Sequence, residues 1–319
     1  MTVGRAAYVL RAALLEGLDP AADIPRGGAE VPSGGQLLWM PSTSRDHAGV
    51  KLLTVGGDPW IQGAYLLFDG PTLAPVALLD GPALTDLRTP AVSFAGVLEI
   101  LSARRRPGAP LRVAIIGSGP QAVHHALGAV ELFGGGKGGE DGVEVTFVVR
   151  TPRDIACDVP HVVATELPAD ADFIVCATSA AEPVLADADV ADHAVVVAMG
   201  AHDPAKRELP GELMGRAAVI VEDPHVAETE CGDVMIAVDE GHLERGDWTT
   251  FRDVVVKPEL ARELADSDRP VVFKTAGMSW EDLAVAVEIV ARPCHDVRPE
   301  AHSATSRTRE PYPVHDKTA

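Results

Sequence analysis

The sequence predicts an α/β protein in which a doubly wound parallel sheet of the Rossmann type follows a smaller antiparallel or mixed sheet. From Leu111 onward, apolar runs typical of strands buried on both faces alternate with helical segments. The first of these strands enters a glycine-containing loop, GSGPQA at residues 117–122, which opens a helix. Before residue 107, short apolar runs are instead separated by Gly-Gly and Gly-Pro pairs, which favour closely spaced strands.

The first eighty residues are expected to form one helix and a small sheet. Residues 1–19 have the pattern of a short amphipathic helix, and residues 22–36, with Pro25, Pro32 and four glycines, are expected to be irregular. The candidate strands that follow are residues 36–40, 50–55, 64–69 and 75–79.

A second helix is predicted to begin at Thr89. This threonine suits the N-cap, and Pro90 suits the first helical position. Apolar residues then recur at helical spacing through 94–101, and Arg104 to Arg106 place cations at the carboxyl end, where they complement the helix dipole. Pro107 and Gly108 break the chain before the parallel sheet.

The remaining elements follow βαβ order, which predicts a mostly parallel sheet. Expected strands of this sheet are 111–117, 143–150, 172–178, 194–200 and 217–223, and expected helices are 121–133, 234–240 and 258–265. A further strand at 270–275 and a helix at 278–291 close the chain. Residues 293–319 are polar and non-periodic, so we expect them to be disordered.

Charge and composition exclude several classes of function. A formal net charge of −20 disfavours nucleic-acid and anionic-membrane partners. No apolar run is long enough to span a bilayer, and the first helix carries Glu16 and Asp19 without a signal-peptide cleavage site. The four cysteines form no CxxC pair and the histidines no HExxH motif, so we expect no metal site and a reducing cytoplasmic location.

The loop at residues 117–122 has the GxGxxA form of a dinucleotide-binding turn. Gly117 permits the tight turn, Gly119 lets the backbone approach a pyrophosphate, and Ala122 keeps the helix close to the strand. Free N–H groups at the start of the helix favour the anion. The predicted cofactor loop is Gly117, Ser118, Gly119, Pro120, Gln121 and Ala122.

Arginines at the end of the next strand indicate NADP(H). An NAD enzyme is expected to place an acidic residue there, whereas this chain has Arg150, Thr151 and Arg153, which suit a 2′-phosphate. NAD(H) remains possible, because the same residues also fit a solvated turn. Thr178 and Ser179 are expected to line the cofactor as well, and so is Thr275, near the nicotinamide.

Several motifs together resemble the ornithine cyclodeaminase/mu-crystallin family. They are Met40-Pro41, Gly49-Val50-Lys51, Leu84-Thr85-x-x-Arg88-Thr89, Gly117-x-Gly-x-Gln121-Ala122, Gly200-x-x-Asp203 and Gly277-x-x-x-x-Asp282-Leu283. They stand in the family's order and span about Arg26 to Ala291. The chain departs from the pattern by beginning late and by lacking a helix-like segment between Arg153 and Asp172.

The resemblance implies a discontinuous fold and a homodimer. A mixed α/β substrate and dimerisation domain, residues 1–107 plus 271–292, would contain the inserted dinucleotide-binding domain, residues 108–270. The family acts on small amino, imino or keto acids.

The resemblance also assigns the substrate residues. Arg26, Lys51 and Arg88 match the family's carboxylate-binding cations, and Asp203 matches its catalytic carboxylate, with Lys51 also expected to act in catalysis. The residues themselves agree in part: Lys51 lies in an apolar strand, where an unpaired charge is costly, and Arg88 immediately precedes the predicted helix start, where an anion is favoured. A solvated strand face for Lys51, a structural loop position for Arg26 and an Asx turn before Pro204 for Asp203 stay open as alternatives.

The leading hypothesis is therefore an NADP(H)-dependent oxidoreductase that reduces the C=N bond of a small imino acid. One alternative is a cyclodeaminase-type lyase with bound NAD. Two features disfavour the lyase. Arg150 and Arg153 suit NADP rather than NAD, and Leu38 lies near the position where the resemblance places an acidic residue in cyclodeaminases. A second alternative is a non-catalytic NADPH-binding protein.

Overall fold

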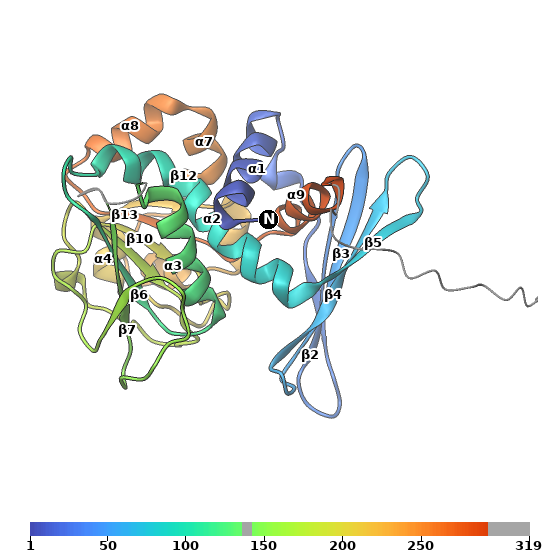
Figure 1. Ribbon diagram of the computed structural model, residues 1–319, viewed down its shortest axis with the longest axis horizontal. Coiled ribbons are helices and arrows are strands. Elements are labelled where there is room, and N and C mark those ends of the chain that lie inside the picture. Colours follow the sequence, from blue (N-terminus) through green and yellow to red (C-terminus); the bar gives the residue numbers. More distant parts are fainter. Residues whose placement is uncertain (136–141, 293–319) are drawn as a thin grey trace, which may run out of the picture.

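The computed structural model describes residues 1–135 and 142–292, and these form two sheets with helices between and around them (Figure 1). The smaller sheet is antiparallel, with the order β1-β2-β3-β4-β5. Its strands are β1 (Gly27–Glu30), β2 (Gln36–Thr43), β3 (His47–Val55), β4 (Ile61–Asp69) and β5 (Pro75–Asp80). Four of these strands agree with the sequence-based expectation. Strand β1 does not, because its GGAE sequence has no apolar alternation.

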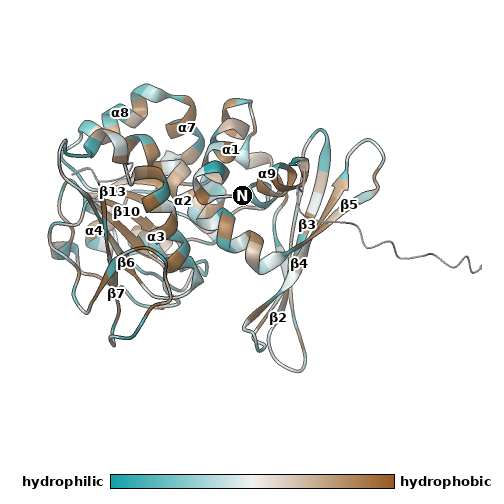
Figure 2. Ribbon diagram, in the orientation of Figure 1, coloured by the Kyte–Doolittle hydropathy of each residue, from teal (hydrophilic) through white to brown (hydrophobic). Residues whose placement is uncertain are grey.

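The larger sheet is parallel throughout, with the order β12-β11-β13-β10-β9-β6-β7-β8. Its strands are β6 (Leu111–Ile116), β7 (Val143–Val148), β8 (His161–Ala164), β9 (Phe173–Cys176), β10 (Val195–Ala198), β11 (Ala218–Val221), β12 (Thr249–Thr250) and β13 (Val271–Lys274). The central strands β9, β10 and β13 are fully buried, and the brown colour of this sheet in Figure 2 marks its hydrophobic residues. The predicted fold class, a doubly wound parallel sheet, is confirmed.

The helices of the described chain cover both faces of the parallel sheet and one face of the small one. They are α1 (Val3–Leu15), α2 (Gly81–Arg104), α3 (Pro120–Phe133), α4 (Gly211–Arg216), α5 (Pro224–Thr229), α6 (Gly232–Asp239), α7 (Phe251–Val256), α8 (Pro258–Asp266) and α9 (Ser279–Ala291), with 3₁₀ turns at Pro20–Ala22 and Asp187–Asp189. Among the described residues no helix is long and apolar enough to cross a membrane.

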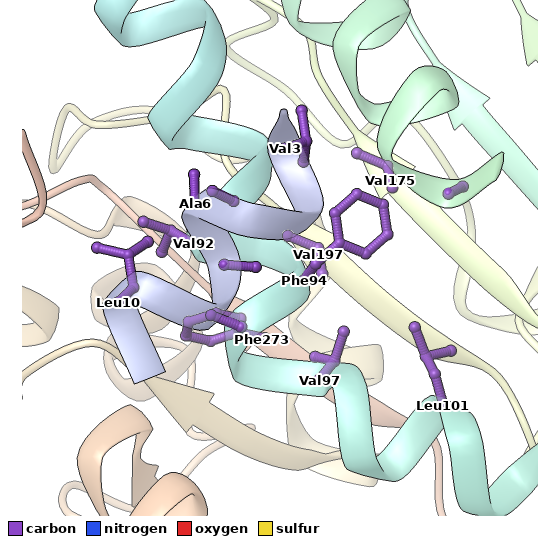
Figure 3. Close-up of a cluster of buried hydrophobic side chains, with 14 of the residues drawn as sticks. Val3, Ala6, Leu10, Val92, Phe94, Val97, Leu101, Val175, Val197 and Phe273 are labelled. Atoms are coloured by element: carbon purple, nitrogen blue, oxygen red, sulfur yellow. The ribbon is translucent and has the colours of Figure 1, made fainter. Parts of the chain in front are cut away.

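The main core lies where α1 and α2 pack on the parallel sheet. Val3, Ala6 and Leu10 of α1 lie in one buried cluster with Phe94 of α2, and side chains from β9, β10 and β13 belong to the same cluster (Figure 3). Phe94 is completely buried. The two sheets are thus joined through shared helices, and α2 contacts both of them.

Helix α2 begins at Gly81, not at Thr89 as predicted, so Arg88 lies inside a helix rather than before one. Asp80 is the N-cap, and its side chain accepts the Ala83 N–H at 2.7 Å. Pro90 sits within the helix and cannot donate to the carbonyl of Asp86, four residues earlier. His124 of α3 bonds that carbonyl through Nδ1 at 2.8 Å, which compensates for the missing backbone hydrogen bond.

Strand β13 lies in the middle of the parallel sheet, between β10 and β11. The sequence grouped residues 271–274 with the closing helix in the substrate domain, yet all four residues are buried in the dinucleotide sheet. The reason is the apolar run at residues 271–273, which is buried on both faces between two parallel neighbours, while Lys274 at its end is paired with Asp233. The segment between Arg153 and Asp172 contains β8 and no helix, in line with its prolines and aspartates. Residues 293–319, expected to be disordered, lie outside the described residues.

Candidate active site

The phosphate loop has the backbone geometry that its glycines predict. Gly117 follows β6 with φ +123°, and a Cβ at this position would stand 2.4 Å from the carbonyl oxygen of Ala177. A side chain is therefore excluded there on two counts. Gly119 is the N-cap of α3, and a Cβ added to it would meet nothing within 4 Å. The space beside the first turn of α3 is open to a ligand, and Ala122 is fully buried beneath it.

The first turns of α3 are tied to α2. Gln121 donates from Nε2 to Asp86 Oδ1 at 2.8 Å, next to the His124 contact already described. His125 is buried between the Gln121 carbonyl and the Ser93 hydroxyl, and burial lowers the pKa of its imidazole to about 4. Gln121 therefore fixes the helix by its side chain, and His125 has a packing role.

Two arginines flank the phosphate loop in different ways. Arg153 reaches back to the loop and donates from Nε to Ser118 Oγ at 3.1 Å. Arg150 and Thr151, after β7, are exposed. Within the described residues, Arg150 has no hydrogen bond or ion pair, so its guanidinium is available to an anion.

The other predicted cofactor residues lie at the carboxyl edge of the same sheet, where ligands of doubly wound folds bind. Thr178 follows β9, but its hydroxyl donates to Glu208 at 2.7 Å and so faces the interior. Ser179 beside it is exposed. Thr275 follows β13, is buried, and donates its backbone N–H to the Ala198 carbonyl at 3.0 Å.

Lys51 and Arg88 come together on one carboxylate that the sequence reasoning did not assign. Lys51 Nζ lies 2.7 Å from Asp282 Oδ2, and Arg88 Nε lies 3.1 Å from Asp282 Oδ1. Arg88 also pairs with Glu281 through NH1 at 3.1 Å. All four side chains are buried, which excludes a solvated strand face for Lys51. The first turn of α9 thus supplies the counter-ions for cations from β3 and α2.

The burial of this cluster has opposite effects on its two cations. Desolvation, with the nearby charge of Arg88, lowers the pKa of Lys51 to about 8, although Asp282 works against this shift. Burial also opposes the charge of Arg88, but Asp282 and Glu281 outweigh it and raise the pKa of its guanidinium. Arg88 is therefore a permanent cation, while Lys51 titrates in the physiological range.

Arg26 lies at the junction between the two sheets. Its NH2 forms an ion pair with Glu230 at 2.8 Å and donates to the carbonyls of Ala276 and Gly277. Gly277 has φ +77°, and a Cβ there would stand 2.2 Å from Arg88 NH1. The turn before α9 therefore brings Arg26 and Arg88 to the same short segment.

Asp203 lies in the loop after β10 and forms the Asx turn that its sequence also allows. Its Oδ1 accepts the Ala205 N–H at 3.0 Å, and Lys206 is 3.3 Å from Oδ2. The Ala205 bond chiefly, then Lys206, hold the pKa of this carboxyl below its usual value. The side chain is 43% exposed, so its turn contact leaves room for a second partner. The neighbouring His202 is exposed, and its Nδ1 lies 3.3 Å from the Gly200 carbonyl oxygen.

Several further buried acids and bases of the described chain were given no role from the sequence, among them Glu208, Glu222, Asp233, Lys274, Glu281 and Asp282. Lys274 could have been found by the argument used for Lys51, since it too is a lone charge in an apolar strand. The acids lie at or near the starts of helices, where an N-terminal capping role is the ordinary interpretation.

Known proteins resemble this chain over most of its length. The model of the ornithine cyclodeaminase/mu-crystallin family matches residues 16–294. The chain is 29% identical over 264 residues to Delta(1)-pyrroline-2-carboxylate reductase 2 of Burkholderia ambifaria, covering 80% of this chain and 79% of that protein. It is 31% identical over 266 residues to ketimine reductase mu-crystallin of Mus musculus, covering 79% of each. The crystal structure of a probable ornithine cyclodeaminase from Bordetella pertussis Tohama I has a TM-score of 0.73 at 28% identity, covering 90% of this chain and 91% of that one.

Proposed function

Because the chain belongs to the ornithine cyclodeaminase/mu-crystallin family, we propose that it is an oxidoreductase that uses NADPH to reduce the C=N bond of a small cyclic imino acid. Relatives of similar length are named as reductases of pyrroline-2-carboxylate and of ketimines. The observation that carries the proposal is the buried cation cluster of Lys51 and Arg88, with Arg26 beside it.

This cluster suits a substrate carboxylate. Lys51 and Arg88 share Asp282, and Arg26 approaches the same turn through Gly277. A planar guanidinium can bind a carboxylate through two parallel hydrogen bonds, and an ammonium adds a point charge. Holding the carboxylate in this way orients the adjacent imine carbon, and such orientation supplies much of the rate gain in enzymes of this kind.

The loop residues fit a dinucleotide. The turn at Gly117 and the open space at Gly119 would admit a pyrophosphate at the start of α3, with Ser118 beside it. Ser179 and Thr275, at the carboxyl ends of β9 and β13, would line the remaining length. When bound, a reduced nicotinamide supplies a hydride to the imine carbon.

Asp203 would act on the proton of the imine nitrogen during this reduction. The imine nitrogen must hold a proton as its carbon becomes saturated, and a carboxylate beside it stabilises that cationic N–H. The lowered pKa of Asp203 in the free protein means that the group begins ionised.

NADPH is preferred in this proposal, because Arg150 and Arg153 offer two guanidinium groups where a 2′-phosphate would lie. Arg153 already contacts the phosphate loop through Ser118, and Arg150 is exposed with no partner in the described chain.

We also propose a homodimer in which the exposed face of the small sheet forms the interface. Helices α2 and α9 pack on one of its faces. The opposite face carries Trp39, Leu52 and Leu78, which are 37%, 45% and 72% exposed. Trp39 and Leu52 are paired across β2 and β3, so the apolar surface is continuous. Burying such a face against a second copy is the ordinary outcome for an apolar patch of this kind. In this proposal residues 1–107 and the closing helix form the substrate and dimerisation domain, around the dinucleotide-binding domain.

A reductase is favoured over a cyclodeaminase by Leu38. This residue pairs with Leu53 and therefore lies on the face of the sheet that carries Lys51. A diamino acid would bring a second ammonium into this region, where leucine offers no counter-ion.

The proposal is tested by mixing the purified protein with NADPH and Δ1-pyrroline-2-carboxylate or Δ1-piperideine-2-carboxylate. We expect loss of the nicotinamide absorbance and formation of proline or pipecolate. Ornithine or lysine with NAD is the matched control. Ammonia release from these diamino acids, without imine reduction, would support the lyase instead. NADPH binding with neither reaction would support a non-catalytic role.

A further inference from the structure

Three charged side chains behind the proposed cofactor site are completely buried. Glu208 lies just before α4, Asp233 in the first turn of α6, and Lys274 at the end of β13. They come from three separate segments and meet at the carboxyl edge of the parallel sheet. Buried charges are costly unless fully paired, so their contacts show what they hold in place.

Glu208 binds the ends of two neighbouring strands. One carboxylate oxygen accepts the Thr178 N–H at 2.9 Å, just after β9. The other accepts the Gly200 N–H at 2.7 Å and the Ala201 N–H at 3.3 Å, just after β10. These bonds draw the two loops together, and a Cβ on Gly200 would stand 1.9 Å from the Thr178 carbonyl oxygen.

Lys274 binds the other side of the same loop. Its Nζ donates to the Ala201 carbonyl at 2.5 Å and forms an ion pair with Asp233 Oδ2 at 2.9 Å. Asp233 Oδ1 in turn accepts the backbone N–H groups of Glu208 and Leu209, at 2.7 and 2.8 Å. Ala201 is therefore held at both its N–H and its carbonyl, two residues before Asp203.

From these contacts we infer that Glu208, Asp233 and Lys274 are positioning residues for Asp203. They fix the loop from Gly200 to Asp203, so that the carboxylate is presented at the sheet edge instead of moving with an exposed turn. The inference rests on the proton-handling role proposed for Asp203. None of the three side chains need touch substrate, because they act through backbone atoms of the loop.

The decisive variant is the double substitution Lys274→Met with Asp233→Asn. It removes one positive and one negative charge, so the net charge of the buried group does not change. The amide that replaces the Asp233 carboxylate can still accept the two N–H groups through its carbonyl oxygen. We expect the hydride-transfer rate in single turnovers to fall roughly 10- to 100-fold, since small misplacements of a reacting group have effects of this size. NADPH affinity should stay within about twofold, because the polar partners of Lys274 in the described chain are Ala201 and Asp233, and neither belongs to the phosphate loop.

Combination with Asp203→Asn separates positioning from general destabilisation. If the network acts through Asp203, adding the double substitution to Asp203→Asn should lower the hydride-transfer rate by less than about threefold. The effects of the substitutions would then be clearly non-additive. The control is Arg11→Met with Glu99→Gln, which removes the ion pair between α1 and α2, away from the site. Equal losses in the presence and absence of Asp203 would overturn the inference.

A second variant is used if the first does not fold, and a second measurement is used if the protein reduces no imine. If the double variant does not fold, Glu208→Gln takes its place. A glutamine has one acceptor oxygen where glutamate has two, so it cannot hold both loops. The same non-additivity with Asp203→Asn is expected. If the wild type reduces no imine, the proposed function fails, and amide hydrogen exchange then tests the positioning alone. Faster exchange confined to residues 199–206 in the variants supports it, and unchanged exchange there refutes it.

Discussion

Lys51 and Asp282 form a buried ion pair, 2.7 Å between Nζ and Oδ2, that joins β3 to α9. The side chains are 1% and 0% exposed. The same carboxylate also accepts from Arg88, so one aspartate aligns two cations. Asp282 is therefore the residue that organises the proposed carboxylate clamp, while burial beside Arg88 makes the charge of Lys51 sensitive to pH.

Carboxylate binding should weaken above pH 8. Burial lowers the pKa of Lys51 to about 8, and an anion binds the protonated form, so affinity is complete below this pH and lost as pH rises through it. The measurement is the affinity for cyclopentanecarboxylate from pH 6.5 to 9.5, since this probe has no group that titrates there. In Lys51→Arg the cation stays charged and the profile should be flat. A pH dependence that persists in this variant would assign the titration to another group.

Arg88→Lys should weaken carboxylate substrates by roughly 10- to 100-fold, because an ammonium cannot reproduce the fork that contacts Asp282 and Glu281. NADPH affinity should change little. The matched control is Arg11→Lys, which makes the same change at a buried arginine between α1 and α2. Steady-state kinetics give the substrate affinity of both variants, and thermal unfolding gives their stability. If both variants lose substrate affinity equally, the effect is one of stability and not of the clamp.

NADPH should bind at least about tenfold more tightly than NADH, and Arg150→Ala should remove most of that preference. A charge-assisted contact with phosphate is worth roughly 1.5–3 kcal/mol, which corresponds to tenfold or more in affinity. Fluorescence titration with NADPH and NADH measures the two affinities in the wild type and the variant. Arg5→Ala, an exposed arginine on α1, should leave both affinities unchanged. Equal affinities in the wild type would rule out the NADP assignment.

Asp203→Asn should reduce the hydride-transfer rate by roughly 10²–10⁴, the usual effect of removing a positioned acid or base. Asparagine can keep the hydrogen bond from Ala205, so the turn and substrate affinity should persist. Lys206→Met is the control, because it removes the ion pair but leaves the carboxyl. Single-turnover absorbance with saturating NADPH isolates the chemical step. A rate within a few-fold of wild type in Asp203→Asn would leave this residue with a turn role only.

Leu78→Glu should convert a dimer into monomers. Leu78 is 72% exposed on the apolar face of the small sheet, and a carboxylate there would have to be desolvated against the second copy. Light scattering after size exclusion gives the mass. Val162→Glu, a 63% exposed position on β8 of the other sheet, should not change it. A wild type that is monomeric at micromolar concentration would contradict the proposed interface.

The sequence by itself determined the features that depend on neighbouring residues. The apolar runs defined most strands of both sheets, and the GSGPQA loop placed the nucleotide turn, because a tight turn between strand and helix needs glycine at set positions. Lys51 stood out as a lone charge in an apolar strand, and the family resemblance added Arg26, Arg88 and Asp203. These signals depend on residues close together in the sequence, so they can be recognised without the tertiary structure.

Only the tertiary structure decided between local signals of equal strength. Asp80 with Pro82 and Thr89 with Pro90 both suit a helix start, yet the helix begins at the first, because His124 from another helix bonds the carbonyl that Pro90 leaves without a donor. The counter-ion of Lys51 was likewise hidden, since Asp282 is distant in sequence and resembles an ordinary acid in the first turn of a helix. Burial makes charge pairing obligatory, but it does not determine which partner along the chain will provide it.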